Sequence, residues 1–115
     1  MQYMLIQYTP TDKMAGSAPD GGIPDAAAWE AYTQMLVGAG VTRGGNGLHP
    51  SDTATTVKQR GDKTTVQDGP FIDSKDQLGG YYVIETDTLD EALEYAAKSP
   101  AAVSGAVEVR PVYTA

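Results

Sequence analysis

Hydrophobic residues along the chain repeat with either a two-residue or a 3.6-residue period. From Gln2 to Tyr8 apolar side chains occupy both alternating sets, which predicts a strand inside a sheet. A second strand is predicted over Tyr81–Glu85, and a last one over Val107–Val112, where Pro111 suits a sheet edge. Between Val41 and Leu48 three glycines interrupt the pattern, so we expect only a short, irregular strand there.

Two segments carry the 3.6-residue repeat of an amphipathic helix. The first is predicted from Pro24 to Gly38, with Trp29 beside its apolar stripe. The stripe consists of Ala28, Tyr32, Met35, Leu36 and Ala39. Trp29 has three interpretations: it caps the core, lines a pocket or meets a partner chain. The second helix is predicted to begin at the capping box Thr88–Glu91 and to stop at Ser99 and Pro100.

The remaining segments are predicted to be loops and a hairpin. The segment from Thr9 to Gly22 is rich in Pro, Gly, Asp and Ser, which indicates a mobile surface loop. Residues 54–59 and 63–67 carry β-branched residues on both sides of a glycine turn, which predicts a partly solvated hairpin. Asp68–Phe71 is predicted to be a turn, and Ile72–Leu78 a short polar connection.

Without the hairpin, the predicted elements follow the order βαββαβ. This order is typical of an α+β, ferredoxin-like protomer, here with an inserted hairpin, formed by a single domain over residues 1–115. Its two helices cover one face of an antiparallel sheet. Because the strands supply apolar groups to both faces, the uncovered face predicts a homodimer.

The composition excludes several kinds of chemistry and partner but does not assign a function. The chain has 115 residues and no cysteine, which excludes thiol nucleophiles, disulfides and iron–sulfur clusters. A net charge of −7 predicts that neither nucleic acid nor an anionic membrane is a partner. The first residues lack a basic flank, and there is no run of 18 apolar residues, so we expect neither an export signal nor a membrane span, and a cytoplasmic location.

A series of short motifs resembles the DGPF branch of the YCII-related proteins, which is named after the tetrapeptide Asp68–Phe71. The other motifs follow in family order: Gly47-Leu48-x-Pro50, Ala54–Val57, Asp73-x-Lys75-Asp76-Gln77-Leu78-Gly79-Gly80, Leu89–Ala92 and Gly105–Pro111. The resemblance implies a dimeric α/β barrel built from two ferredoxin-like protomers. It also implies a functional link to an extracytoplasmic-function sigma factor, because genes of this branch often lie beside such genes.

Some wider YCII-related proteins are small enzymes, including a dehydrochlorinase, that rely on a His–Asp pair. The first predicted helix of this chain contains no histidine. The only histidine, His49, lies between Leu48 and Pro50 and is a candidate ligand-binding or acid–base residue. One histidine and no cysteine leave only oxygen ligands for a metal, so neither a metal nor an organic cofactor is expected.

The best candidate site is a patch around the Gly-Pro turn. It comprises Asp68, Phe71, Asp73, Lys75 and Arg110. Its two cations suit a small anionic ligand, which favours a binding or regulatory module of uncharacterised function. The alternative is a cofactor-independent enzyme for proton abstraction or elimination, with Asp68 as acid or base. A purely structural role is equally consistent, in which Asp68 accepts hydrogen bonds from its own turn.

Overall fold

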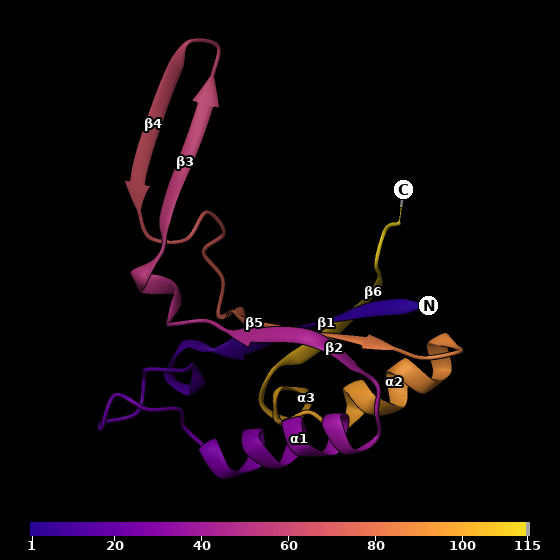
Figure 1. Cartoon of the computed structure of the whole chain (residues 1–115). Coiled ribbons are helices and arrows are strands. Elements are labelled where there is room, and N and C mark those ends of the chain that lie inside the picture. The colour runs from indigo at the N-terminus through magenta and orange to yellow at the C-terminus, as the bar shows by residue number, and fades with distance from the viewer. Residues whose placement is uncertain (115) are drawn as a thin grey trace.

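The computed structural model describes residues 1–114 as one antiparallel sheet with helices on one side and a projecting hairpin on the other (Figure 1). The sheet consists of β1 (Gln2–Pro10), β2 (Thr42–Gly47), β5 (Asp76–Glu85) and β6 (Ala106–Pro111). The helices are α1 (Ala26–Gly38), α2 (Leu89–Ala97) and α3 (Pro100–Ser104), with single turns η1 (Thr11–Lys13) and η2 (Ser51–Thr53). None of the helices described over residues 1–114 has the length and apolarity needed to span a bilayer.

The strand order confirms the predicted ferredoxin-like protomer. The sheet runs β2-β5-β1-β6, and every neighbouring pair is antiparallel. The hairpin of β3 (Thr55–Arg60) and β4 (Lys63–Asp68) is a separate two-stranded sheet inserted between β2 and β5. The central position of β1 follows from its composition, because a strand with apolar groups on both faces is best placed between two neighbours.

Strand β1 divides its side chains between two environments. Tyr3, Leu5, Gln7 and Thr9 are buried on the side of the helices. The alternate residues Met4, Ile6 and Tyr8 lie on the opposite side and are only partly buried. We call this opposite side the open face. Across the strands it is continued by the register partners of β1, which are Val83, Tyr81 and Leu78.

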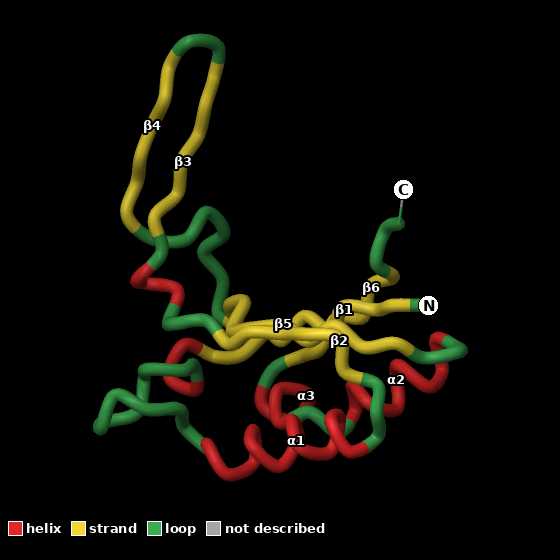
Figure 2. The backbone as a smooth tube through the Cα atoms, in the orientation of Figure 1, coloured by secondary structure: helices red, strands yellow, loops and turns green. Residues whose placement is uncertain are grey.

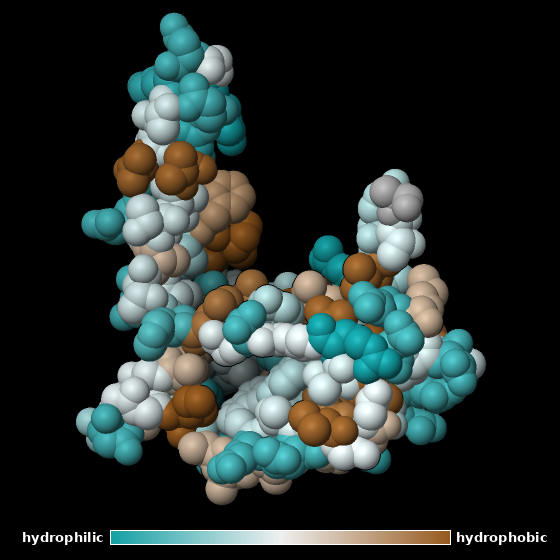
Figure 3. Space-filling model, viewed as in Figure 1, coloured by the Kyte–Doolittle hydropathy of each residue, from teal (hydrophilic) through white to brown (hydrophobic). Residues whose placement is uncertain are grey.

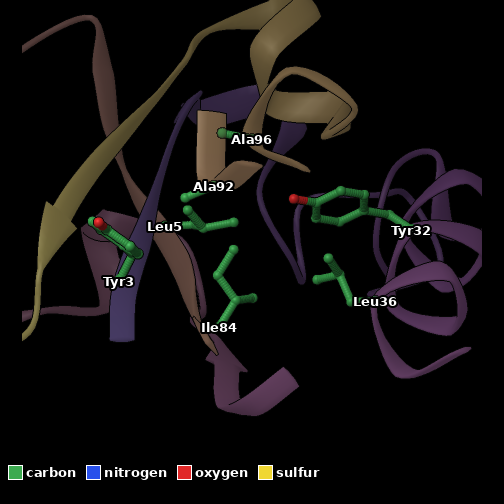
Figure 4. Packing of buried hydrophobic residues seen from close by; sticks show 7 residues of the cluster. All are labelled: Tyr3, Leu5, Tyr32, Leu36, Ile84, Ala92 and Ala96. Carbon is green, nitrogen blue, oxygen red and sulfur yellow. The ribbon is translucent and has the colours of Figure 1, made fainter. Parts of the chain in front are cut away.

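The hydrophobic core lies between the sheet and the helices (Figure 4). Leu5 and Ile84 from the sheet and Leu36 from α1 are fully buried in it. The buried core residues of the second helix are Ala92 and Ala96, and the partly buried Tyr95 packs beside them. Small side chains allow this helix to pack closely on the sheet at β6, and the larger Leu89 and Leu93 of the same helix remain nearly half exposed.

Helix α2 begins as the capping box predicts, since the Thr88 hydroxyl accepts a hydrogen bond from the Glu91 amide at 3.2 Å. It also ends at the predicted place. Beyond that end, Ser99 caps the additional short helix α3, which the sequence pattern did not reveal because five residues are too few to show a period.

Three predicted boundaries were wrong. The segment after Tyr8 is not simply a surface loop, because β1 continues to Pro10 and Met14 is 1% exposed. Strand β5 begins at Asp76 rather than Tyr81, since Asp76, Gln77, Leu78 and Gly80 all pair with β1. Helix α1 begins at Ala26, two residues after Pro24, because Asp25 adopts a left-handed conformation with φ of 58°.

The hairpin is a solvated projection, as predicted (Figure 2). It rises from the side of the sheet that carries no helix. Val57 and Val66 are directly paired across its strands and are 62% and 65% exposed. An isolated two-stranded ribbon with apolar side chains in water is only marginally stable by itself.

Gly105 fixes the junction between α3 and β6, and we expect Gly105→Ala to destabilise the fold by about 1–3 kcal/mol. A Cβ atom at this position would lie 2.1 Å from the Tyr8 carbonyl oxygen, so the backbone would have to move. The matched control is Gly38→Ala at the end of α1, where a Cβ meets nothing within 4 Å. The control is expected to be neutral or stabilising by about 0.5–1 kcal/mol. Urea unfolding of both variants checks this, and equal stabilities would contradict it.

Candidate functional site

A cleft of about 530 Å³ lies between the first half of α1 and the sheet. It is bounded by the end of β1, by the segment that follows it, and by β2 and β5. The surface is visibly hollowed between the sheet and α1 (Figure 3). This volume suits a small organic molecule, and such pockets are usually apolar with a few polar groups.

Glycines form the floor of the cleft, where the backbones of neighbouring strands lie too close together for a Cβ atom. A Cβ on Gly45 would lie 2.6 Å from the Tyr81 carbonyl oxygen, and one on Gly80 would lie 2.8 Å from the Asn46 carbonyl oxygen. Gly45 also has a φ of 155°, which L-residues rarely adopt. The glycines that made β2 irregular in the sequence pattern therefore shape the cleft.

Aromatic rings form its apolar wall. Trp29 packs edge-on against Tyr32, with ring centroids 6.3 Å apart, and Tyr32 packs edge-on against Tyr82 at 5.3 Å. Trp29 and Tyr82 line the cleft, whereas Tyr32 is buried behind them. Of the three interpretations of Trp29, the structure supports two, because this side chain both packs on the core and lines a pocket.

Three polar side chains around the cleft, those of Gln7, Thr33 and Tyr82, already have hydrogen-bond partners. The Thr33 and Tyr82 hydroxyls are 2.8 Å apart and hold each other. The buried Gln7 amide donates to the Leu5 carbonyl at 3.2 Å and accepts from the Ser99 hydroxyl at 2.5 Å. These bonds fix the polar groups in place before any ligand binds.

Thr9 is different, because its Oγ1 atom is buried and has no hydrogen-bond partner among the described residues. The residue is 4% exposed and lies in the wall of the cleft. Two side chains of opposite charge, Lys13 and Glu30, also line the cleft and are exposed.

The residues predicted from the Gly-Pro turn lie outside this cleft. Asp68 ends β4, and Phe71, Asp73 and Lys75 follow it; all four are exposed. Phe71 is 64% exposed and is therefore not a core residue, and the Lys58 ammonium lies 5.5 Å from its ring centre. The connection is held from below by buried Gln77, which donates to the carbonyls of Ile72 and Ser74.

Arg110 is not brought together with that turn within one protomer. It pairs with Met4 on β1, whereas Asp76, next to Lys75, pairs with Pro10. Six residues of strand separate the two positions, which is roughly 20 Å. Arg110 instead forms an ion pair with Glu108 of its own strand.

His49 is exposed and also lies outside the cleft. It packs beside Gly16, where a Cβ would be 3.1 Å from the imidazole Nδ1. The Asp68 carboxylate accepts no hydrogen bond from the described residues, so neither its turn-capping nor its acid–base interpretation gains support within the protomer. Over residues 1–114 no three His, Asp or Glu side chains gather in a way that suits a metal ion.

The sequence pattern therefore missed the cleft-lining residues of β1 and β5. One signal was present: Gln7 and Thr9 are polar, yet they continue the strand face begun by Tyr3 and Leu5. Polar residues on an otherwise buried strand face indicate either an internal hydrogen bond or a pocket. Gln7 forms the internal hydrogen bonds, and Thr9 borders the pocket.

The fold and cleft define an α+β protein of ferredoxin-like topology with a pocket between its first helix and the sheet. The chain belongs to the YCII-related domain family, whose model matches residues 1–115. It is 42% identical over 67 residues to an uncharacterised protein of Rhizobium meliloti (strain 1021). That alignment covers 56% of this chain and 54% of the relative, so the match spans about half of each protein.

A solved structure supports the fold. The chain is similar to 5-chloro-2-hydroxyhydroquinone dehydrochlorinase of Burkholderia phenoliruptrix AC1100, solved in complex with 2,5-dihydroxybenzoquinone. The TM-score is 0.52 at 18% identity, and the match covers 100% of this chain and 96% of the enzyme. At this identity the likeness shows a shared fold.

Tyr32 provides a pH test of the packing behind the cleft. Its hydroxyl donates to the Tyr95 carbonyl at 2.9 Å, and burial, followed by the neighbouring Tyr82, raises its pKa above the usual value of about 10. Because the folded state holds this proton more tightly, the free energy of unfolding should be unaffected below about pH 10 and fall above it, where the unfolded state ionises first.

Tyr32→Phe is expected to lose about 1 kcal/mol at neutral pH through the missing hydrogen bond, but to show a smaller alkaline decline than the wild type. Urea unfolding from about pH 8 to about pH 11 measures both effects. The same alkaline slope in the two proteins would contradict the assignment to Tyr32.

Proposed function

We propose that this protein is a small-molecule-binding module whose ligand occupies the cleft between α1 and the sheet. The observation that supports the proposal is the combination of a volume of about 530 Å³ with an aromatic wall and with side-chain hydrogen bonds of Thr33, Tyr82 and Gln7 that are formed in the absence of ligand. A pre-organised pocket avoids the ordering cost that weakens binding to flexible surfaces.

The aromatic wall favours a small, flat and mostly apolar ligand. Trp29 and Tyr82 offer ring faces and edges on which a second ring packs well. The likeness to an enzyme solved with a dihydroxybenzoquinone is consistent with this ligand class. We therefore propose an aromatic or quinone-like molecule rather than a peptide or polynucleotide.

A bulky residue at the cleft should abolish binding without unfolding the protein. Ala26 and Ala27 are adjacent exposed residues in the first turn of α1, and only Ala26 lines the cleft. We expect Ala26→Phe to eliminate the thermal shift caused by 2,5-dihydroxybenzoquinone, and Ala27→Phe to retain it. At 100 times the Kd, binding should stabilise the wild type by about 2.7 kcal/mol. Identical responses of the two variants would count against this cleft, and no binding by the wild type would count against this probe class.

The dehydrochlorinase likeness also supports a second candidate, a cofactor-independent enzyme for proton abstraction or elimination. Within the cleft the carboxylate available as a base is that of Glu30, whereas Asp68 lies outside it in the protomer. If turnover of a bound aromatic compound is found, the two carboxylates are separated by comparing Glu30→Gln with Asp68→Asn. Only the catalytic carboxylate should reduce turnover by about 10²–10⁴-fold while binding persists.

We further propose that two copies of the chain associate through their open faces to form a dimeric α/β barrel. Met4, Ile6 and Tyr8 form an apolar row on this face, and no helix covers it. The hairpin rises beside the same face and carries the exposed pair Val57 and Val66, so a second copy seated on the sheet would also meet the hairpin.

Charge placed in the apolar row should separate the two copies. We expect Ile6→Glu to give a monomeric mass by sedimentation equilibrium at micromolar concentration, because burying an unpaired carboxylate in an apolar interface is unfavourable. Val37→Glu is the control, since Val37 lies on α1 and is 53% exposed on the helical side. A monomeric wild type would overturn the barrel proposal.

A further inference from the structure

We propose that Thr9 is the ligand-binding residue at the inner end of the cleft, where its hydroxyl donates a hydrogen bond to a ligand carboxylate that also contacts the Lys13 ammonium. The inference rests on the proposed binding function and assigns the ligand class: a small aromatic acid. Its origin is the one buried side-chain atom without a partner over residues 1–114, Thr9 Oγ1. Buried polar atoms in proteins almost always have a partner, so an exception calls for one that is supplied from outside the chain.

Gly79 lies directly beside the Thr9 hydroxyl. The position that a Cβ would take on Gly79 is 2.9 Å from Thr9 Oγ1, and the next atoms are 3.8 and 3.9 Å away. Gly79 itself lines the cleft. A side chain at this position would collide with the hydroxyl, so the buried Thr9 side chain can take this place in the cleft wall only beside a glycine.

The neighbouring polar groups do not compete for the ligand oxygen. The Gln7 amide is held by Leu5 and Ser99, and the Thr33 and Tyr82 hydroxyls hold each other. Among the hydroxyl groups that line the cleft, Thr9 is the buried one whose hydrogen-bonding capacity is unused.

Lys13 decides the charge of the ligand group. It follows β1 in the turn η1 and lines the same two grooves as Thr9, on either side of Trp29, so cation and hydroxyl border a common space. No carboxylate of residues 1–114 lies within ion-pair distance of the Lys13 ammonium. Glu30 lines the cleft from α1, and its carboxylate repels a second carboxylate. A ligand whose only charge is its carboxylate would therefore place that group beside Lys13 and its apolar end beside Glu30. Hydrogen bonds with an ionised partner are the stronger kind, which favours a carboxylate over a neutral carbonyl.

Benzoate and benzylammonium are matched probes of opposite charge, followed by the amide signals of Gly79 and Gly80 in ¹⁵N-labelled full-length protein. We expect benzoate to shift these signals and benzylammonium to leave them unchanged. Thr9→Val, which replaces the hydroxyl by a methyl group of similar shape, should weaken benzoate binding about tenfold or more, and Lys13→Gln should also weaken it. Thr9→Ser retains the hydroxyl and should retain binding.

A melting temperature separates this role from a structural one. Because the Thr9 hydroxyl has no partner in the free protein, ligand-free Thr9→Val should melt at the wild-type temperature or above it. Benzoate binding that is equal in Thr9→Val and the wild type would overturn the assignment but leave the cleft as a binding site. A response to benzylammonium alone would overturn the ligand class. No shift with either probe would overturn the assignment of Thr9 to an aromatic acid. The blocking variants at Ala26 and Ala27 then test separately whether the cleft binds a ligand.

Discussion

The alternation of side chains along β1 is the constraint on which the rest of the structure depends. This strand is paired on both sides, with β5 and with β6, so it cannot turn without breaking two rows of backbone hydrogen bonds. Because successive side chains of a strand lie on opposite faces, Tyr3 and Leu5 lie in the helical core and Met4 and Ile6 lie on the open face. One strand therefore determines both where the helices pack and where an uncovered apolar surface remains.

The same alternation explains why the core ends where the cleft begins. Along the buried side of β1, the apolar Tyr3 and Leu5 give way to Gln7 and Thr9. Gln7 is satisfied through Ser99, which also caps α3 and so ties the end of the helical layer to the sheet. Beyond this point glycines replace side chains on β2 and β5, and the space between α1 and the sheet is not filled. The cleft thus follows from the residues of the strands themselves, because glycines there leave the space unfilled.

Most of the fold could be predicted because its elements carry local signals. The capping box at Thr88, the hairpin turn at Gly61 and the two-sided apolar strand β1 each depend on residues close together in sequence. The site could not be predicted in the same way, since Thr9, Trp29 and Gly79 are distant in sequence and meet only through the strand order. The tetrapeptide Asp68–Phe71 was the most distinctive motif, yet it forms a turn at the foot of the hairpin, outside the cleft of the same protomer.

The central claim is that the helical side of the sheet holds the ligand and the open face holds the partner. The most direct measurement is the anomalous scattering of bromine in crystals of the full chain grown with 4-bromobenzoate. The bromine signal locates the ligand even where the electron density of its lighter atoms is weak. We expect a bromine peak in the cleft beside Trp29, with the carboxylate toward Thr9 and Lys13. A bromine peak on the open face or along the hairpin, with the cleft empty, would contradict it.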